Sequence, residues 1–126
     1  MAKILIVDDE EMDRILLSEI LHQAGHEPLF APNGQVALNI WKRAKVDLVV
    51  TDIVMPELNG LELFEKMREE DPWVRVIAIS GVTAKKLNEA ASSGALAILT
   101  KPVDPEELLT EIEKALENSG SWMEVE

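Results

Sequence analysis

The sequence lacks cysteine and is poor in basic residues, with 12 Lys and Arg against 24 Asp and Glu. Without cysteine, neither disulfides nor thiolate metal sites can form. The net charge of −12 repels the phosphate backbone of nucleic acids, so we expect no direct binding to DNA or RNA. No run of about 18 apolar residues occurs, and we therefore expect no membrane-spanning helix.

The first residues do not form the core of a signal peptide. Only four clearly apolar residues, Ile4–Val7, separate Lys3 from the acidic pair Asp8 and Asp9, which is too short for such a segment. We expect a cytoplasmic protein, which the absence of cysteine also fits. A chain of 126 residues matches one domain. We predict that this domain covers residues 1–118 and that residues 119–126 form a flexible tail.

Short apolar runs alternate with helical patterns along the chain. Runs that are apolar on both faces predict five buried parallel strands. These runs are Ile4–Val7, a weaker one near Pro28–Ala31, Leu48–Val50, Val76–Ile79 and Leu96–Leu99. Apolar residues spaced as on one face of a helix predict a helix after each strand. These stripes lie within Leu17–Ala24, Ala37–Ala44, Leu63–Met67, Leu87–Ala91 and Leu108–Ala115. The alternation predicts a mostly parallel sheet with helices on both faces.

Residues typical of helix ends agree with this pattern. Gly25, the Asp71–Pro72 pair and Gly94 stand where the first, third and fourth helices would end. Asp104 followed by Pro105 is typical of a helix start, because aspartate is a favoured N-cap and proline a favoured first helical residue. The last helix is therefore predicted to begin there.

Polar residues follow the predicted strands, where an open α/β sheet carries its ligand site. The residues in question are Asp8, Asp9, Thr51, Asp52, Ser80, Thr100 and Lys101. With the strand order 2-1-3-4-5, the first and third strands are neighbours, so three carboxylates would meet at one edge of the sheet. A hydroxyl and an ammonium would lie beside them.

Clustered carboxylates need a neutralising partner, because like charges at short range disfavour one another's ionised forms. Magnesium suits the predicted set, since it accepts one or two carboxylates and pairs with a phosphoryl oxygen. A calcium cage would need more ligands than the sequence offers here. An aspartate beside such a metal can act as a nucleophile toward phosphorus, while an ammonium and a hydroxyl stabilise the transferred group. The residues therefore favour phosphoryl transfer.

The ordered motifs of the chain are those of a known family. They are Ile4–Asp9, Asp52 followed by Pro56 and Gly60, Ser80, and Lys101–Pro102. Over residues 3–118 the sequence resembles the receiver domain of two-component response regulators, including the stand-alone chemotaxis type. The resemblance implies a flavodoxin-like (βα)5 fold, a doubly wound parallel sheet with strand order 2-1-3-4-5.

The resemblance also implies a role for each acidic site residue. Asp52 would be the phosphoacceptor. Asp9 and Asp52 would bind Mg²⁺ directly, together with the main-chain carbonyl of Val54. Asp8 would act on the metal through water.

By the same resemblance, Lys101 would form a salt bridge to the phosphoryl group and Ser80 would donate a hydrogen bond to it. The Lys101–Pro102 bond would be cis. Two positions depart from the family pattern. Ile98 stands where the family often has Tyr or Phe, so readout of the signal there is expected to be weaker or differently built. Gly81 stands where alanine is more usual, which leaves the loop backbone freer.

Other polar residues near the first helix are expected to have structural roles. Glu10, Glu11 and Asp13 are typical of a solvated acidic helix start, where the helix dipole favours negative charge. His22 and His26 lie near the end of the first helix, away from the predicted strand-end site. A structural role is favoured for both histidines over metal binding.

The sequence predicts a phosphorylation-controlled signalling switch rather than an enzyme acting on other molecules. A sensor histidine kinase or phosphotransfer protein would supply the phosphoryl group, and a downstream effector or separate output domain would receive the signal. A phosphorylation-dependent dimer is compatible with this hypothesis. One alternative is a magnesium-dependent phosphohydrolase, although Ile53 and Val54 follow Asp52 where a second carboxylate would be needed. Another is an interaction module of the same fold that works without phosphorylation.

Overall fold

A computed structural model describes residues 2–81 and 97–117. Its elements are β1 (Lys3–Val7), α1 (Glu11–Gln23), β2 (Glu27–Ala31), α2 (Gly34–Arg43), β3 (Leu48–Asp52), α3 (Gly60–Glu70), β4 (Val76–Ser80), β5 (Ala97–Thr100) and α5 (Pro105–Glu117). The predicted helix at Leu87–Ala91, its stop at Gly94 and the predicted tail lie outside the described residues. In the described ranges, no helix combines the length and the apolar character needed to cross a membrane.

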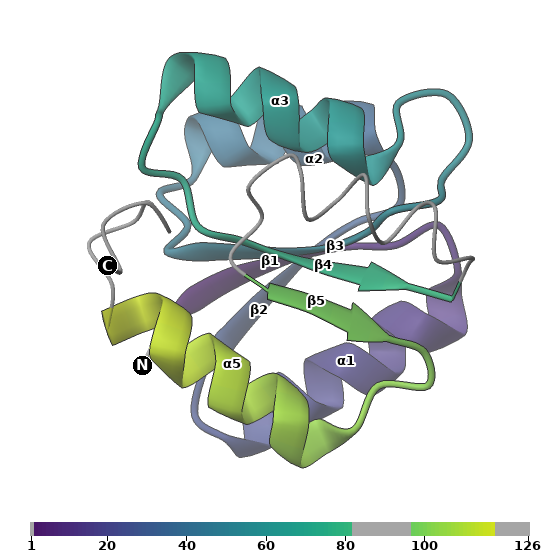
Figure 1. Cartoon of the computed structure of the whole chain (residues 1–126), viewed down its shortest axis with the longest axis vertical. Helices are drawn as coiled ribbons and strands as arrows, with labels where there is room; N and C mark the ends of the chain where they lie inside the picture. The colour runs from purple at the N-terminus through teal and green to yellow at the C-terminus, as the bar shows by residue number, and fades with distance from the viewer. Residues whose placement is uncertain (1, 82–96, 118–126) are drawn as a thin grey trace.

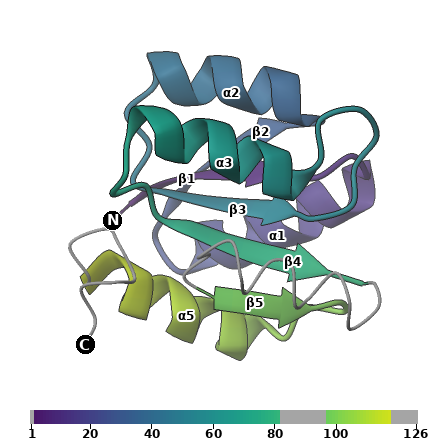
Figure 2. The same ribbon diagram turned by 45° about the horizontal axis from the view of Figure 1, so that its top comes forward.

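The five strands form one parallel sheet in the order β2-β1-β3-β4-β5. Helices α2 and α3 cover one face of this sheet, and α1 and α5 cover the other (Figures 1 and 2). This arrangement confirms the predicted flavodoxin-like fold and its strand order. Val7 pairs with Thr51, and Asp52 pairs with Ile79, so the carboxyl ends of the three central strands are level with one another.

Apolar side chains alternate between two cores. Ile4 and Ile6 of β1 belong to the core under α1 and α5, whereas Leu5 and Val7 belong to the core under α2 and α3. This is the period-two alternation of a strand, with both sets of side chains buried. The strand β1 is thus packed on both faces up to the loop that follows it.

The described helix boundaries confirm the sequence signals. Gly25 follows α1 with a φ of 89°, a conformation that glycine adopts without strain. Helix α3 ends at Glu70, immediately before the Asp71–Pro72 pair, and α5 begins at Pro105. The sequence analysis did not identify the start of α3, where Asn59 and Glu62 form a reciprocal capping box.

Candidate functional site

The carboxyl ends of β1 and β3 bring three aspartates together. Asp8 and Asp9 directly follow β1, and Asp52 is the last residue of β3. One carboxylate oxygen from each lies within 4.8 Å of the others. Asp8 and Asp52 are buried, with 1% and 7% of their surface exposed, and Asp9 is exposed. The predicted convergence of these residues is therefore confirmed.

Lys101 lies directly after β5 and reaches across to the aspartates. Its Nζ donates hydrogen bonds to Oδ2 of Asp8 at 3.2 Å and to Oδ2 of Asp52 at 3.2 Å. A third bond, of 2.8 Å, runs to Oδ2 of Asp13 in the first turn of α1. Burial alone would lower the pKa of Lys101, but these carboxylates outweigh it and raise the pKa above its usual value. The ammonium is thus firmly protonated.

Both buried aspartates are held in an environment that disfavours their charge. Burial raises the pKa of Asp52, the positive charge of Lys101 opposes this shift, and the negative charge of Asp8 adds to it. Burial likewise raises the pKa of Asp8, against its bond from the Glu10 amide and the charge of Lys101. Lys101 therefore does not fully offset the cost of burying these two charges.

Main-chain groups fix the orientation of both buried carboxylates. The Glu10 N–H donates to Asp8 Oδ1 at 2.9 Å, and the Val54 N–H donates to Asp52 Oδ1 at 3.3 Å. Arg14 of α1 donates from Nη1 to the main-chain carbonyl of Asp8 at 2.7 Å. These hydrogen bonds hold the Asp8 and Asp52 side chains in fixed positions relative to the loops after β1 and β3.

Ser80 is the last residue of β4 and is fully buried. Its carbonyl accepts a hydrogen bond from the Lys101 N–H at 3.0 Å, which ties the two predicted site residues through the main chain. The Lys101–Pro102 bond is cis, as the resemblance implied. A hydrogen bond from the Ser80 hydroxyl to a phosphoryl group and metal ligation by the Val54 carbonyl stay predictions.

Ile98 is half-buried and packs against the buried side chains of Ile53 and Ala78. An isoleucine in this position fills its space with a branched aliphatic group. It has no ring to move between inward and outward orientations. The residue that departs from the family pattern therefore packs directly against Ile53, the residue after Asp52.

The sequence analysis missed two contributors, Asp13 and Arg14. The sequence predicts a solvated acid of a helix start at Asp13, but this residue makes the shortest of the three Lys101 hydrogen bonds. No sequence spacing indicates this contact, because the two residues lie 88 positions apart in the chain. Glu10 is less involved, with its Oε1 at 3.9 Å from Nζ and a largely exposed side chain. Arg14 holds only a main-chain carbonyl, which no sequence pattern indicates.

Gly60 allows the close approach of α3 to the end of β3. Its N–H donates to the Ile53 carbonyl at 2.9 Å. A Cβ added at Gly60 would collide with the carbonyl oxygen of Asp52 and lie 2.9 Å from the Ile53 Cα. Because both contacts are with main-chain atoms, the loop that carries Asp52 would have to move.

We expect Gly60→Ala to lower the free energy of unfolding by about 1 to 3 kcal/mol, because it overpacks a site that cannot relax. Gly81→Ala is the matched control, since its nearest Cβ neighbours are side-chain atoms of Lys101 at 3.6 Å, an ordinary contact. Urea denaturation of both variants measures the difference. Equal stability of the two variants would show that the loop after β3 yields without strain.

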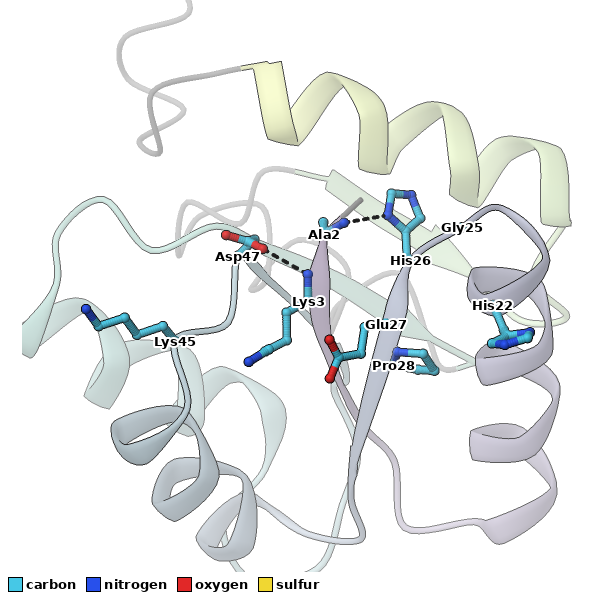
Figure 3. A pocket seen from close by; sticks show the side chains of 9 residues that line it. All are labelled: Ala2, Lys3, His22, Gly25, His26, Glu27, Pro28, Lys45 and Asp47. Atoms are coloured by element: carbon cyan, nitrogen blue, oxygen red, sulfur yellow. Dashed lines mark hydrogen bonds between the residues drawn. The ribbon is translucent and has the colours of Figure 1, made fainter.

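A separate cavity of about 510 Å³ lies near the amino-terminal ends of β1 and β2 (Figure 3). Its lining residues are Ala2, Lys3, His22, Gly25, His26, Glu27, Pro28, Lys45 and Asp47. The His26 Nδ1 accepts a hydrogen bond from the Ala2 N–H at 3.2 Å, and an Asp47 oxygen accepts one from the Lys3 N–H at 2.8 Å. Since Lys3 and Glu27 begin β1 and β2, this cavity is remote from the strand ends that carry the aspartates.

Comparisons with known proteins agree with this geometry. The family model for the response regulator receiver domain matches residues 4–113. Sporulation initiation phosphotransferase F of Bacillus subtilis is 36% identical over 115 residues, which cover 90% of this chain and 93% of that protein. Chemotaxis protein CheY of Thermotoga maritima is 33% identical over 114 residues, 89% of this chain and 95% of that one.

A solved structure shows the same likeness in three dimensions. The response regulator TrrA from Thermotoga maritima, in complex with Mg²⁺–BeF, superimposes with a TM-score of 0.85 at 32% identity. The match covers 92% of this chain and 100% of that one. The family model matches residues 4–113, which include the five strands and reach into α5. The protein therefore belongs to the receiver domains of two-component response regulators.

Proposed function

We propose that Asp52 accepts a phosphoryl group from the phosphohistidine of a sensor histidine kinase or phosphotransfer protein, in a reaction that depends on Mg²⁺. The observation that carries this proposal is the position of Lys101. Its ammonium, which follows β5, donates a hydrogen bond to Asp52 at the end of β3, and Asp8 and Asp9 follow β1, the neighbour of β3 on the other side. A nucleophilic carboxylate is thus surrounded by the charges that phosphoryl transfer requires.

The transfer balances without any further reactant. A carboxylate oxygen of Asp52 forms a bond to phosphorus while the bond between phosphorus and the donor imidazole nitrogen breaks. The imidazole keeps the electron pair of that bond and, with a proton on its other ring nitrogen, leaves as the neutral ring. Lys101, which lies 3.2 Å from Asp52 Oδ2, would donate a hydrogen bond to an oxygen of the transferred group, and Ser80 at the end of β4 would donate to another.

The donor set at the site fits magnesium. It offers carboxylate oxygens from Asp8, Asp9 and Asp52 within 4.8 Å of one another, with neither sulfur nor imidazole in the group. Hard oxygen ligands of this kind suit Mg²⁺. We assign direct contacts to Asp9, Asp52 and the Val54 carbonyl, and a contact through water to Asp8. When bound, the ion would neutralise negative charge on the phosphoryl oxygens.

The proposed outcome of phosphorylation is a shift between two surface conformations, which a downstream effector or separate output domain detects. The donor would approach over α1. Three apolar side chains of this helix, Met12, Ile15 and Leu16, are 74%, 46% and 53% exposed. The helix also carries Asp13, which contacts Lys101, so a partner packed on these side chains would lie beside the site.

We expect the protein to gain one labile phosphoryl group from acetyl phosphate and Mg²⁺, detected by intact mass spectrometry. Asp52→Asn should abolish the gain, because the amide is a far poorer nucleophile than the carboxylate, and EDTA should abolish it in the native protein. Asp47→Asn, the same change at the opposite edge of the sheet, should leave it intact. Persistence of the added mass in Asp52→Asn would contradict the proposal.

Two other measurements distinguish the alternatives. As proposed, the domain catalyses only its own phosphorylation and dephosphorylation, so it should not turn over phosphomonoesters repeatedly. Repeated turnover would instead support a phosphohydrolase. Partner binding that is equal with and without beryllofluoride would support a module that acts independently of phosphorylation.

A further inference from the structure

Asp13 contacts Lys101 more closely than either buried aspartate does. Its Oδ2 lies 2.8 Å from Nζ, whereas Oδ2 of Asp8 and Oδ2 of Asp52 both lie at 3.2 Å. Asp13 is on α1, and its side chain is 33% exposed. It is not a member of the Asp8, Asp9 and Asp52 group to which we assign the metal, although its carboxylate lies within 4.8 Å of those of Asp8 and Glu10 in a second acidic group.

The three hydrogen bonds use every N–H of the ammonium. A phosphoryl oxygen on Asp52 can therefore bond to Lys101 only by replacing one of the three acceptors. Asp13 is the most exposed of the three acceptors, with 33% of its side chain exposed against 1% for Asp8 and 8% for Asp52. Water can therefore solvate the Asp13 carboxylate when Lys101 leaves it, whereas a buried carboxylate would lose its partner without replacement.

We infer that Asp13 is a positioning residue that competes with the phosphoryl group for Lys101. In the unphosphorylated protein it draws the ammonium toward α1. On phosphorylation the ammonium exchanges this carboxylate for an oxygen of the phosphoryl group. Asp13 thereby weakens binding of the phosphoryl group and favours the unphosphorylated state. This inference rests on the proposed function of Asp52.

The test is calorimetric titration of the full chain with beryllofluoride in saturating Mg²⁺. Asp13→Asn should bind the probe roughly threefold or more tightly than the control Glu11→Gln, as expected for the loss of one partly exposed ion pair. Glu11 and Asp13 are both acidic residues of the first turn of α1, so the control removes the same charge from the same turn. Among the described residues, Glu11 forms no ion pair with Lys101.

Two further readouts separate competition from a structural effect. Titration with Mg²⁺ alone should change by the same factor in both variants if the ion binds at Asp8, Asp9 and Asp52, and a larger change in Asp13→Asn would place it at Asp8, Glu10 and Asp13 and overturn the inference. Asp13→Glu restores a carboxylate and should return the beryllofluoride affinity toward that of the native protein. If Asp13→Glu binds as tightly as Asp13→Asn, loosening of α1 is the cause and the inference is wrong.

Equal beryllofluoride affinity in Asp13→Asn and Glu11→Gln would overturn the inference, as would weaker binding by Asp13→Asn. In both cases Asp52 would remain the phosphoacceptor, because the native protein would still bind the probe with Mg²⁺. A native protein that does not bind the probe at all would overturn the proposed function itself, and this inference with it.

Discussion

Lys101→Ala should slow phosphoryl addition to Asp52 by about a hundredfold, the usual effect of removing one group that stabilises charge in the transition state. Lys101 is the cation that hydrogen-bonds Asp52, and its raised pKa keeps it charged throughout the pH range in which the protein would work. The measurement is the rate at which the native mass converts to the phosphorylated mass with acetyl phosphate in saturating Mg²⁺.

Lys114→Ala is the control for this variant. Lys114 lies on α5 and pairs with Glu111 at 3.8 Å, so its removal deletes the same charge without touching the site. If both variants react at the native rate, Lys101 is only a counterion for the metal-free carboxylates. A Lys101→Ala protein that binds Mg²⁺ normally but reacts slowly would place the effect on the transferred group.

The strands could be predicted from the sequence to the extent that they are buried. β1, β3 and β4 are buried along nearly their whole length, so their apolar runs stand out. β2 gave a weaker signal because it is an edge strand, with three of its five residues half-buried or buried and two exposed. β3 extends beyond the predicted run to include Asp52, since pairing with β4 continues through the polar residues.

The site residues that directly follow strands could be predicted from the sequence. The contacts that depend on the conformation of a long side chain could not. Asp8, Asp52 and Lys101 are placed by the topology of the sheet, which the alternation of strands and helices already implied. The contact between Asp13 and Lys101 joins residues 88 positions apart in the chain. It depends on the conformation of a long, flexible side chain, and sequence spacing does not determine that conformation.

Asp52→Asn should raise the free energy of unfolding in EDTA at neutral pH, because a buried charge that Lys101 does not fully compensate is replaced by a neutral group of the same shape. Burial raises the pKa of Asp52 in the folded state from the ordinary value of 3.8. Below pH 3.8 the carboxyl group is protonated in both the folded and the unfolded state. The native protein and Asp52→Asn should therefore differ little in stability there.

The stability difference should grow as the pH rises above 3.8, because the unfolded protein then loses the proton more readily than the folded one. It should reach its full size above the raised folded-state pKa. Urea denaturation between about pH 4 and pH 8 in EDTA measures this profile. Asp9→Asn, which removes the same charge from the exposed member of the cluster, should give a smaller gain.

Adding Mg²⁺ should then reduce the advantage of Asp52→Asn. An ion that binds the folded protein stabilises it in proportion to its affinity, and the native site keeps the carboxylate that the variant has lost. The same group would thus destabilise the metal-free protein and stabilise the metal-bound one, as expected for a residue retained for ligand binding rather than for folding. A native protein that is more stable than Asp52→Asn in EDTA would show instead that the Lys101 ion pair outweighs the burial of the charge.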